Sequence, residues 1–223
     1  FFALPQSPQI LKQLTMISGF DKYYQIARCF RDEDLRADRQ PEFTQLDMEM
    51  SFANREQVYR EMEGMFNHVL KLIGVNLPTE WPRLTYAEAM RRFGSDKPDL
   101  RFGMELIDLT TELKGTDFAP FADVLAKGGE IKCIVVKGRA DYSRKQTDEL
   151  QEFVKRYGAG SLAWIKIPVR AGSDSDWAPA SSLLKVLGEE KIARLTEVSG
   201  AVEGDAVLIV AGKKSVVAAA LGA

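Results

Sequence analysis

A short segment near the N-terminus concentrates side chains that could bind charged ligands. Residues 31–42 hold three arginines and five acidic residues within twelve positions. The arginine guanidinium is a planar set of donors that suits phosphate, whereas carboxylates accept amine donors or hold Mg²⁺. The segment therefore indicates a site for ligands that carry phosphate, carboxylate or ammonium groups.

Polar residues also alternate along the run that follows this segment. Gln45, Asp47 and Glu49 share one face of this run. Arg31, the first residue of the charged segment, also ends the alternating run at residues 23–31. An ordinary half-buried sheet does not need such a face, so it suggests a cleft. A solvent-exposed face with cross-strand charge pairs is the alternative. The density of charge in residues 31–42 favours the cleft.

The rest of the composition excludes several chemistries. His68 is the single histidine, which excludes a multi-histidine metal centre, and we assign it no chemistry. Cys29 and Cys133 lie far apart without a CxxC pair, which argues against a disulfide framework and suits a reducing, cytosolic compartment. The 30 basic and 32 acidic residues nearly balance, so net charge alone does not predict a nucleic-acid partner.

The elements that would position the polar face are a hairpin, a helix that precedes it in the sequence and a helix that follows it. We expect a helix over residues 7–18 with Ser7 as N-cap, strands at 23–31 and 44–52, and a loop at 32–42. Asn54 and Gln57 resemble a capping box that opens a further helix. The apolar stripe of this further helix should cover the apolar face of the hairpin, whose members include Tyr24, Ile26 and Leu46.

The second half of the chain changes to shorter elements and is predicted to be a separate α+β module. A short helix at 86–93 and a loop at 94–99 precede it. Strands are expected at 131–136, 162–167 and 207–210, and a loop at 172–176. A helix is expected at 143–157, opened by a Ser-x-x-Gln cap at Ser143. No run of about 18 apolar residues could span a bilayer, so we expect no membrane segment.

Residues 30–49 closely resemble motif 2 of class II aminoacyl-tRNA synthetases, in the form found in bacterial-type aspartyl-tRNA synthetases. Residues 6–12 are similar to that family's aspartate-recognition segment, and residues 93–99 to the stretch before its inserted domain. Residues 102–223 resemble this insertion, the GAD domain, although Val210-Ala211-Gly212 stands where many relatives carry Gly-Ala-Asp. The resemblance implies an α+β fold: residues 1–101 from the antiparallel-sheet catalytic domain, and 102–223 from the smaller GAD domain.

The resemblance implies a two-step ligase reaction. Aspartate attacks the α-phosphate of ATP with Mg²⁺, and the aspartyl adenylate then esterifies the 3′ end of tRNA. L-aspartate, ATP and tRNA are the implied partners of a cytoplasmic, homodimeric parent enzyme of protein biosynthesis. An asparaginyl or lysyl synthetase, and a non-catalytic synthetase-like or tRNA-binding module, are the alternatives. The segment at 6–12 and the GAD-like region argue against the first alternative, and intact Gln9, Lys12 and Arg31 against the second.

The resemblance also assigns residues to the aspartate substrate. Lys12 would pair with its side-chain carboxylate and so help to select aspartate over asparagine. Ser7, Gln9 and Asp47 would hold its α-ammonium group. Arg31 would bind the reacting carboxylate together with the α-phosphate.

A second set of implied residues belongs to ATP. Arg31 would be the catalytic residue, and Asp32, Glu33 and Gln40 would line the nucleotide site. For Glu49, which faces the same side as Asp47, support of a metal ion and a structural pair both remain open. No protein nucleophile is required, because orientation and stabilisation of charge on phosphorus carry such a reaction.

The family's motifs 1 and 3 and its anticodon-binding barrel have no counterpart in these 223 residues. The chain also begins at Phe1 rather than at a methionine. We therefore expect a piece of a longer enzyme that is inactive alone, because the motif 3 arginine that grips ATP in this family lies elsewhere.

Overall fold

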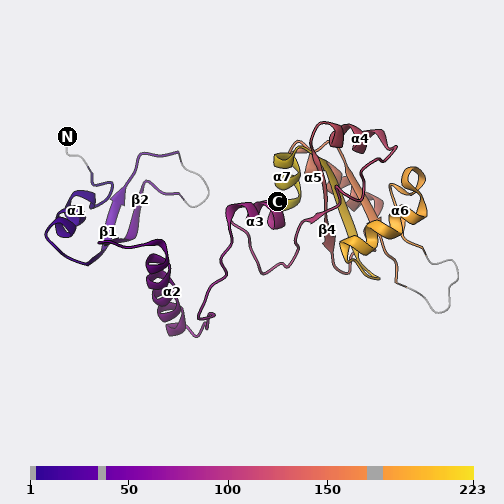
Figure 1. The fold of residues 1–223 in the computed structure, drawn as a ribbon. Coiled ribbons are helices and arrows are strands. Elements are labelled where there is room, and N and C mark those ends of the chain that lie inside the picture. Colours follow the sequence, from indigo (N-terminus) through magenta and orange to yellow (C-terminus); the bar gives the residue numbers. More distant parts are fainter. Residues whose placement is uncertain (1–3, 35–38, 170–177) are drawn as a thin grey trace. The chain divides into compact units, whose positions relative to one another are not determined.

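A computed structural model describes residues 4–34, 39–169 and 178–223 of the chain. The chain divides into two compact units, Phe1–Pro82 and Arg83–Ala223, and each contains antiparallel strands and helices (Figure 1). The α+β class predicted from the sequence is confirmed. The predicted loop at 172–176 and the central part of the loop at 32–42 lie outside the described residues.

The first unit is a two-stranded hairpin with one helix before it and one after it. Its elements are α1 Gln9–Ile17, β1 Lys22–Phe30, β2 Glu42–Met50 and α2 Arg55–Leu72. β1 and β2 pair antiparallel with Gln25 opposite Asp47 and Ile26 opposite Leu46. The predicted hairpin is confirmed, and its register separates the polar from the apolar residues as the alternation indicated.

The two helices begin in different ways. Asn54 forms the predicted capping box, because its side chain accepts from Gln57 N at 2.9 Å and Gln57 Oε1 accepts from Asn54 N at 2.8 Å. The prediction that Ser7 caps the first helix is wrong. α1 begins one residue later, with Pro8 as its N-cap and no side-chain cap hydrogen bond.

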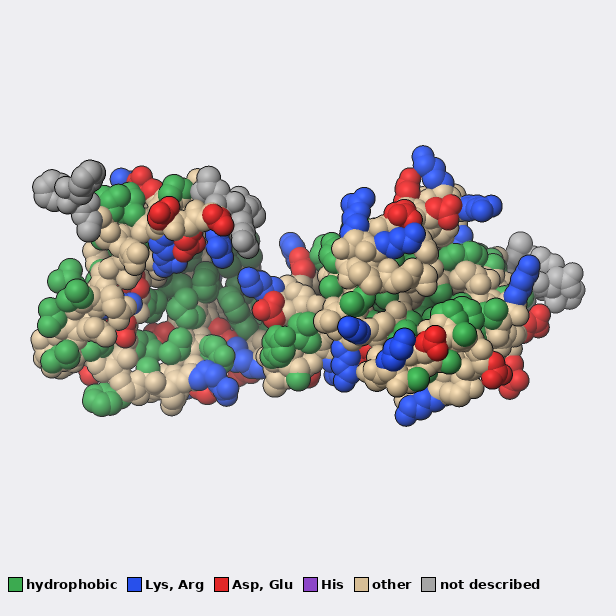
Figure 2. All heavy atoms as spheres, turned by 90° about the horizontal axis from the view of Figure 1, so that it is seen from above, with side chains coloured by type: hydrophobic (Ala, Val, Ile, Leu, Met, Phe, Trp, Pro, Cys, Tyr) green, Lys and Arg blue, Asp and Glu red, His purple; other side chains and the backbone are tan. Residues whose placement is uncertain are grey.

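The prediction that α2 covers the apolar face of the hairpin is also largely wrong. Tyr24 and Ile26 are 74% and 73% exposed, Leu46 is exposed as well, and α2 has no buried residue. α2 lies beside one end of the hairpin, where Lys22 of β1 pairs with Glu61 and where Met48 and Met50 of β2 line a hollow with the first turns of the helix. α1 contacts the opposite, polar face instead, and Figure 2 shows hydrophobic side chains in green at the surface of this unit.

The second unit is an antiparallel sheet between two pairs of helices. Its elements are α3 Tyr86–Phe93, β3 Ile107–Asp108, α4 Ala119–Ala126, β4 Glu130–Val136, α5 Arg144–Lys155, β5 Leu162–Lys166, β6 Ala180–Ser181, α6 Leu184–Ser199, β7 Ala206–Gly212 and α7 Lys214–Gly222. The strand order is β3-β4-β7-β5-β6, and every pair is antiparallel. The predicted helix at 86–93 and the capping box that opens α5 at Ser143 are confirmed.

Successive residues of the central strands enter two different cores. On one face Ile131, Ile165 and Ile209 pack with α4 and α6. On the other face Leu162 and Val210 pack with α5 and α7. Both faces of this sheet are therefore buried by helices, which explains why β7 reads as an almost continuous apolar run.

Short contacts tie α3 to the sheet of the second unit. Lys132 of β4 donates a hydrogen bond to the carbonyl of Arg91 at 3.3 Å, and Arg92 Nε donates to Glu105 at 2.7 Å. A Cβ on Gly94 would lie 2.3 Å from the carbonyl oxygen of Ala218, and one on Gly222 would lie 2.7 Å from that of Phe93. α3 thus belongs structurally to the second unit. The division at 101 and 102, which concerns the limits of an inserted domain, stays a prediction.

None of the helices within the described ranges combines the length and the apolar composition that a membrane span requires.

Candidate functional site

Lys12 is the centre of a buried charge cluster on the polar face of the hairpin. Its Nζ lies 3.0 Å from Asp47 Oδ1 and 3.2 Å from Glu49 Oε2, and only 8% of the residue is exposed. The hydrogen bond to Asp47 raises the pKa of Lys12 above its ordinary value, against the opposing effect of burial, and Glu49 adds to the rise. Lys12 therefore stays charged at neutral pH.

The strand pleat and one helix together create this cluster. Asp47 and Glu49 are two residues apart on β2, so their side chains leave the same face of the hairpin. Lys12 is the one buried residue of α1, whose apolar side chains Ile10, Leu14 and Ile17 are exposed. The ammonium group, rather than an apolar stripe, is what α1 buries against the hairpin.

Two oxygen atoms on this face are buried and have no hydrogen-bond partner in the described structure: Gln45 Oε1 and Asp47 Oδ2. An unmet buried acceptor costs about 1–3 kcal/mol, so both oxygens are placed to accept a hydrogen bond from a donor outside the described residues. Gln45 was predicted to lie on the polar face but was not among the predicted binding residues. Its position two residues before Asp47 was the available signal.

Residues 5–12 lead from the end of β1 to Asp47 on the polar face. The backbone N–H of Phe30 donates to the carbonyl of Pro5 at 3.0 Å, and Lys12 reaches Asp47 seven residues later. Ser7 and Gln9 lie between these two anchors, Ser7 half-buried and Gln9 exposed at the first position of α1. The structure thus brings the predicted aspartate-binding segment to the same face as Asp47.

Arg31 lies just beyond β1, at the other end of this face. Its guanidinium is centred 5.1 Å from the ring of Phe43, and its backbone N–H donates to Pro41 at 2.8 Å. Its Nη1 lies 3.8 Å from Glu33, which also pairs with Arg39 at 3.5 Å. The Arg31 side chain is 44% exposed, so its donors remain accessible to a ligand.

The other predicted nucleotide-binding residues are less constrained. Asp32 and Gln40 are exposed at the two ends of the described parts of the loop, and residues 35–38 between them lie outside the description. The structure brings together Lys12, Asp47 and Glu49, and separately Arg31 and Glu33. It shows no direct contact between these two groups among the residues described.

A Mg²⁺ ion would need several oxygen ligands, and each of the two carboxylates beside Lys12 already pairs one oxygen with the Lys12 ammonium group. Asp47 and Glu49 both pair with Lys12, so of the two predictions for Glu49 the geometry supports a structural pair. The described ranges contain no group of three or more His, Cys, Asp or Glu side chains placed to hold a metal ion. These residues therefore do not fit a resident magnesium site.

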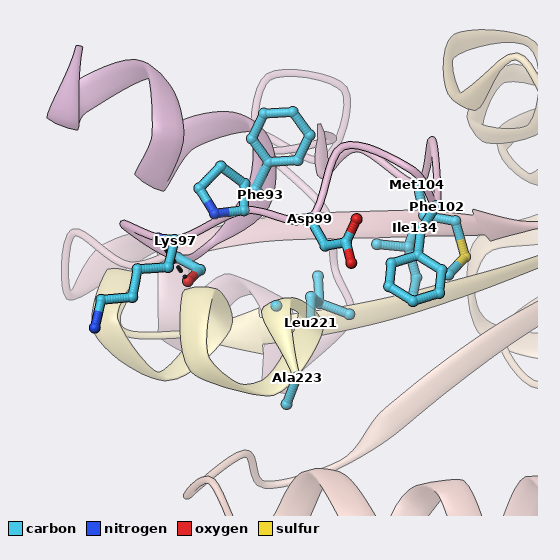
Figure 3. Close-up of a pocket in the computed structure, with 11 residues that line it drawn as sticks. Phe93, Lys97, Asp99, Phe102, Met104, Ile134, Leu221 and Ala223 are labelled. Atoms are coloured by element: carbon cyan, nitrogen blue, oxygen red, sulfur yellow. Dashed lines mark hydrogen bonds between the residues drawn. The ribbon is translucent and has the colours of Figure 1, made fainter. Parts of the chain in front are cut away.

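A second hollow, of about 390 Å³, lies in the second unit and contains none of the predicted site residues. Figure 3 shows its labelled side chains, which come from the end of α3, the following loop, β4 and the end of α7. Phe93, Phe102, Met104 and Leu221 make its walls mainly apolar. It has no polar group that is both buried and unpartnered, unlike the polar face of the hairpin.

Comparison with known proteins gives a consistent result over the whole chain. The model of the family described as class II tRNA synthetases (D, K and N) matches residues 1–199. An aspartate–tRNA ligase of Exiguobacterium sibiricum is 53% identical over 225 aligned residues, and one of Staphylococcus carnosus is 54% identical. A protein of Anoxybacillus flavithermus named aspartate–tRNA(Asp/Asn) ligase is 52% identical. Each alignment covers all of this chain but only 37% of the relative's length.

Proposed function

The chain belongs to the class II tRNA synthetases, and from this premise we propose that the whole protein is an aspartate–tRNA ligase. It activates L-aspartate with ATP to aspartyl adenylate, releases pyrophosphate, and transfers the aspartyl group to the 3′ end of tRNA. We include in the proposal a cytoplasmic homodimer and ATP bound with Mg²⁺. Two relatives of that name align with the whole chain at 53% and 54% identity, and this similarity supports the assignment.

The buried cluster around Lys12 is the observation that carries the substrate assignment. An amino acid brings an ammonium group, and Asp47 Oδ2 and Gln45 Oε1 are two buried acceptors that lack donors. The Lys12 ammonium has three N–H donors, of which Asp47 and Glu49 engage two. The third N–H is available to the side-chain carboxylate of aspartate. Ser7 and Gln9 would lie beside the α-ammonium group of the substrate.

This arrangement favours aspartate over asparagine for an electrostatic reason. A carboxylate next to a buried cation gains a charge-assisted hydrogen bond, which is about twice as strong as a neutral one. The neutral amide of asparagine gains much less and leaves the cation poorly compensated. Lys12 is therefore the residue in this chain on which we place selection of the substrate.

Arg31 carries the phosphate part of the proposal. Its accessible guanidinium suits the α-phosphate of ATP and the reacting carboxylate, where negative charge accumulates in the transition state. Asp32, Glu33 and Gln40 would contact the nucleotide, with Glu33 orienting Arg31 through their ion pair. The Mg²⁺ that accompanies ATP would neutralise phosphate charge, and we assign it to no residue described here.

Aspartate-dependent exchange of pyrophosphate into ATP by the full-length protein tests the proposal. Lys12→Met keeps much of the apolar stem and removes the charge, so the KM for aspartate should rise about ten- to a hundredfold. The KM for ATP should change little. Lys22→Met is the matched control, because Lys22 forms an exposed ion pair with Glu61 in the same unit.

The possible results separate the alternatives. A full-length protein without exchange activity would favour the non-catalytic synthetase-like module. Exchange with asparagine or lysine instead of aspartate would indicate another class II synthetase. If Lys12→Met changed the KM for ATP but not the KM for aspartate, Lys12 would be assigned to the nucleotide site instead. The 223-residue chain by itself should give no exchange, and activity there would contradict the expectation that an ATP-binding arginine lies elsewhere.

A further inference from the structure

Lys12 docks α1 through charge, and this makes the position of its ammonium group depend on its carboxylate partners. Four apolar residues of α1, Ile10, Leu11, Leu14 and Ile17, are 53–81% exposed and add little to the docking of the helix on the hairpin. Met16 is half-buried, and its sulfur accepts from Ser51 Oγ at 3.1 Å, just beyond β2. The two ion pairs of Lys12, at 3.0 and 3.2 Å, are the polar contacts that reach from α1 to β2 inside the buried face. Whatever orients this ammonium group also orients the residue proposed to select the substrate.

The two carboxylates differ in what else they can do. Asp47 is the more enclosed, with a side chain 10% exposed, and its second oxygen is buried and without a partner. The Glu49 side chain is 33% exposed and lies further along β2. Asp47 is therefore suited to contact Lys12 with one oxygen and a ligand with the other. Glu49 is suited to contact Lys12 only.

Binding of an amino acid would weaken the hold of Asp47 on Lys12. When Asp47 Oδ2 accepts from a second ammonium group, its single negative charge is shared between two cations. A second carboxylate on Lys12 compensates for this loss and keeps the remaining N–H directed at the ligand. A hydrogen-bonded partner of this kind is the usual means by which a binding residue keeps its orientation.

We propose that Glu49 is a positioning residue for substrate selection: it holds the Lys12 ammonium group toward the substrate carboxylate while Asp47 engages the substrate amino group. The inference rests on the proposed function and deepens it, because it makes the preference for aspartate depend on a residue that does not touch the substrate. It also replaces the metal-supporting role that the sequence left open for Glu49.

The test uses Glu49→Ala and Glu49→Gln in the full-length protein, with pyrophosphate exchange as the assay. Glu49→Ala removes a charged hydrogen bond, and the KM for aspartate should rise about tenfold. Glu49→Gln keeps a neutral acceptor and should give a smaller rise. The ratio of kcat/KM for aspartate to that for asparagine should fall by the same factor, with the KM for ATP and the requirement for Mg²⁺ unchanged.

Two comparisons distinguish positioning from a merely structural role. Glu61→Ala removes the acid of the exposed pair with Lys22 and should leave all constants within about twofold of the wild type. In a double-mutant cycle with Lys12→Met, Glu49→Ala should cause no further loss, because it acts only through Lys12. A structural role would instead lower the thermal midpoint and change both Michaelis constants together.

Several results would overturn the inference. Glu49→Ala with an unchanged KM for aspartate, or with a loss that adds fully to that of Lys12→Met, would show that Glu49 does not act through Lys12. A lower KM would mean that Glu49 competes with the substrate for Lys12. A changed Mg²⁺ requirement would restore the metal role. A wild-type protein without aspartate-dependent exchange would refute the proposed function itself. This result differs from the others, which all require an active wild-type protein.

Discussion

The two units use their side chains in opposite ways. In the first unit large apolar residues such as Tyr24, Ile26 and Ile17 are exposed, while Lys12 and Asp47 are buried. In the second unit two apolar clusters fill both faces of a five-stranded sheet. The second unit also buries Lys132 and Asp205, but as additions to a large apolar core. The proposed substrate-binding residues all lie in the first unit, whose described part buries only two small apolar residues beside Lys12 and Asp47.

This contrast shows that apolar periodicity identifies a face but not whether that face is covered. Polar and apolar residues alternate along the hairpin, yet its apolar face is exposed, whereas the sheet, whose central strand β7 is an almost continuous apolar run, has helices on each face. A two-stranded hairpin is at best marginally stable in isolation, whereas five strands with covering helices form a core. We expect the second unit to dominate the stability of the 223-residue chain, and four predictions test this.

The largest effect should come from truncating one isoleucine in each unit. Ile165→Ala removes a fully buried side chain of β5 and should lower the free energy of unfolding by about 4 kcal/mol. Ile26→Ala, in an exposed position of β1, should change it by less than about 0.5 kcal/mol. Urea unfolding followed by circular dichroism measures both. Equal losses would remove the contrast between the units.

A slightly smaller effect should follow from deleting α3. A chain that starts at Arg83 should unfold at the same urea concentration as the second unit in the whole chain. A chain that starts at Phe102 loses the Lys132–Arg91 hydrogen bond and the Arg92–Glu105 pair and uncovers α7, and should be about 3 kcal/mol less stable. If the shorter chain were as stable, the division at 101 and 102 would describe the folding unit better.

The two cysteines report local opening, since both are fully buried but lie in different units. Burial raises the pKa of Cys133 to about 12, so this thiol should react only when the sheet opens. Cys29 lies in the two-stranded hairpin, and its reaction with a thiol reagent should be about a hundredfold faster. Mass spectrometry of each labelled peptide gives the two rates. Similar rates would mean that the units open together.

The smallest effect concerns acid stability of the second unit. Asp205 is buried, which opposes its charged form, but hydrogen bonds from Lys137, Gly138 and Val202 lower its pKa overall. Its folded pKa lies below the unfolded value, so its contribution is present above about pH 4 and disappears as pH falls through the folded pKa. Asp205→Asn should cost about 1.5 kcal/mol at pH 7 and less at pH 3, as measured by urea unfolding. A cost that is the same at both pH values would contradict this.

The sequence predicted the hairpin and its polar face because strand alternation is local information. The capping boxes at Asn54 and Ser143 were likewise readable, since each depends on residues three positions apart. Short strands such as β3 and β6 were missed, because two-residue strands leave no periodic signal and exist only through their neighbours. α4, α6 and α7 were also missed, and none of them has a side-chain cap hydrogen bond at its start.

At the candidate site the sequence placed Asp47 and Glu49 on one face, but it could not show that both engage Lys12. That contact joins residues 35 and 37 positions apart and depends on how α1 docks. The unpartnered oxygen of Gln45 could not be predicted from the sequence either, because whether an acceptor has a donor depends on what surrounds it in space. The roles assigned to Ser7, Gln9, Arg31 and Gln40 remain predictions for the full-length protein.

The close approach of α3 and α7 also restricts how this sequence can vary. Gly94 adopts a left-handed conformation with φ of 69°, and a side chain there would collide with the backbone of α7. Gly222 meets the end of α3 in the same way. Because the obstacle at each position is backbone, a substitution at one glycine cannot be accommodated by a smaller residue at the other. Both positions should therefore remain glycine through evolutionary drift, even where the neighbouring loop accepts many replacements.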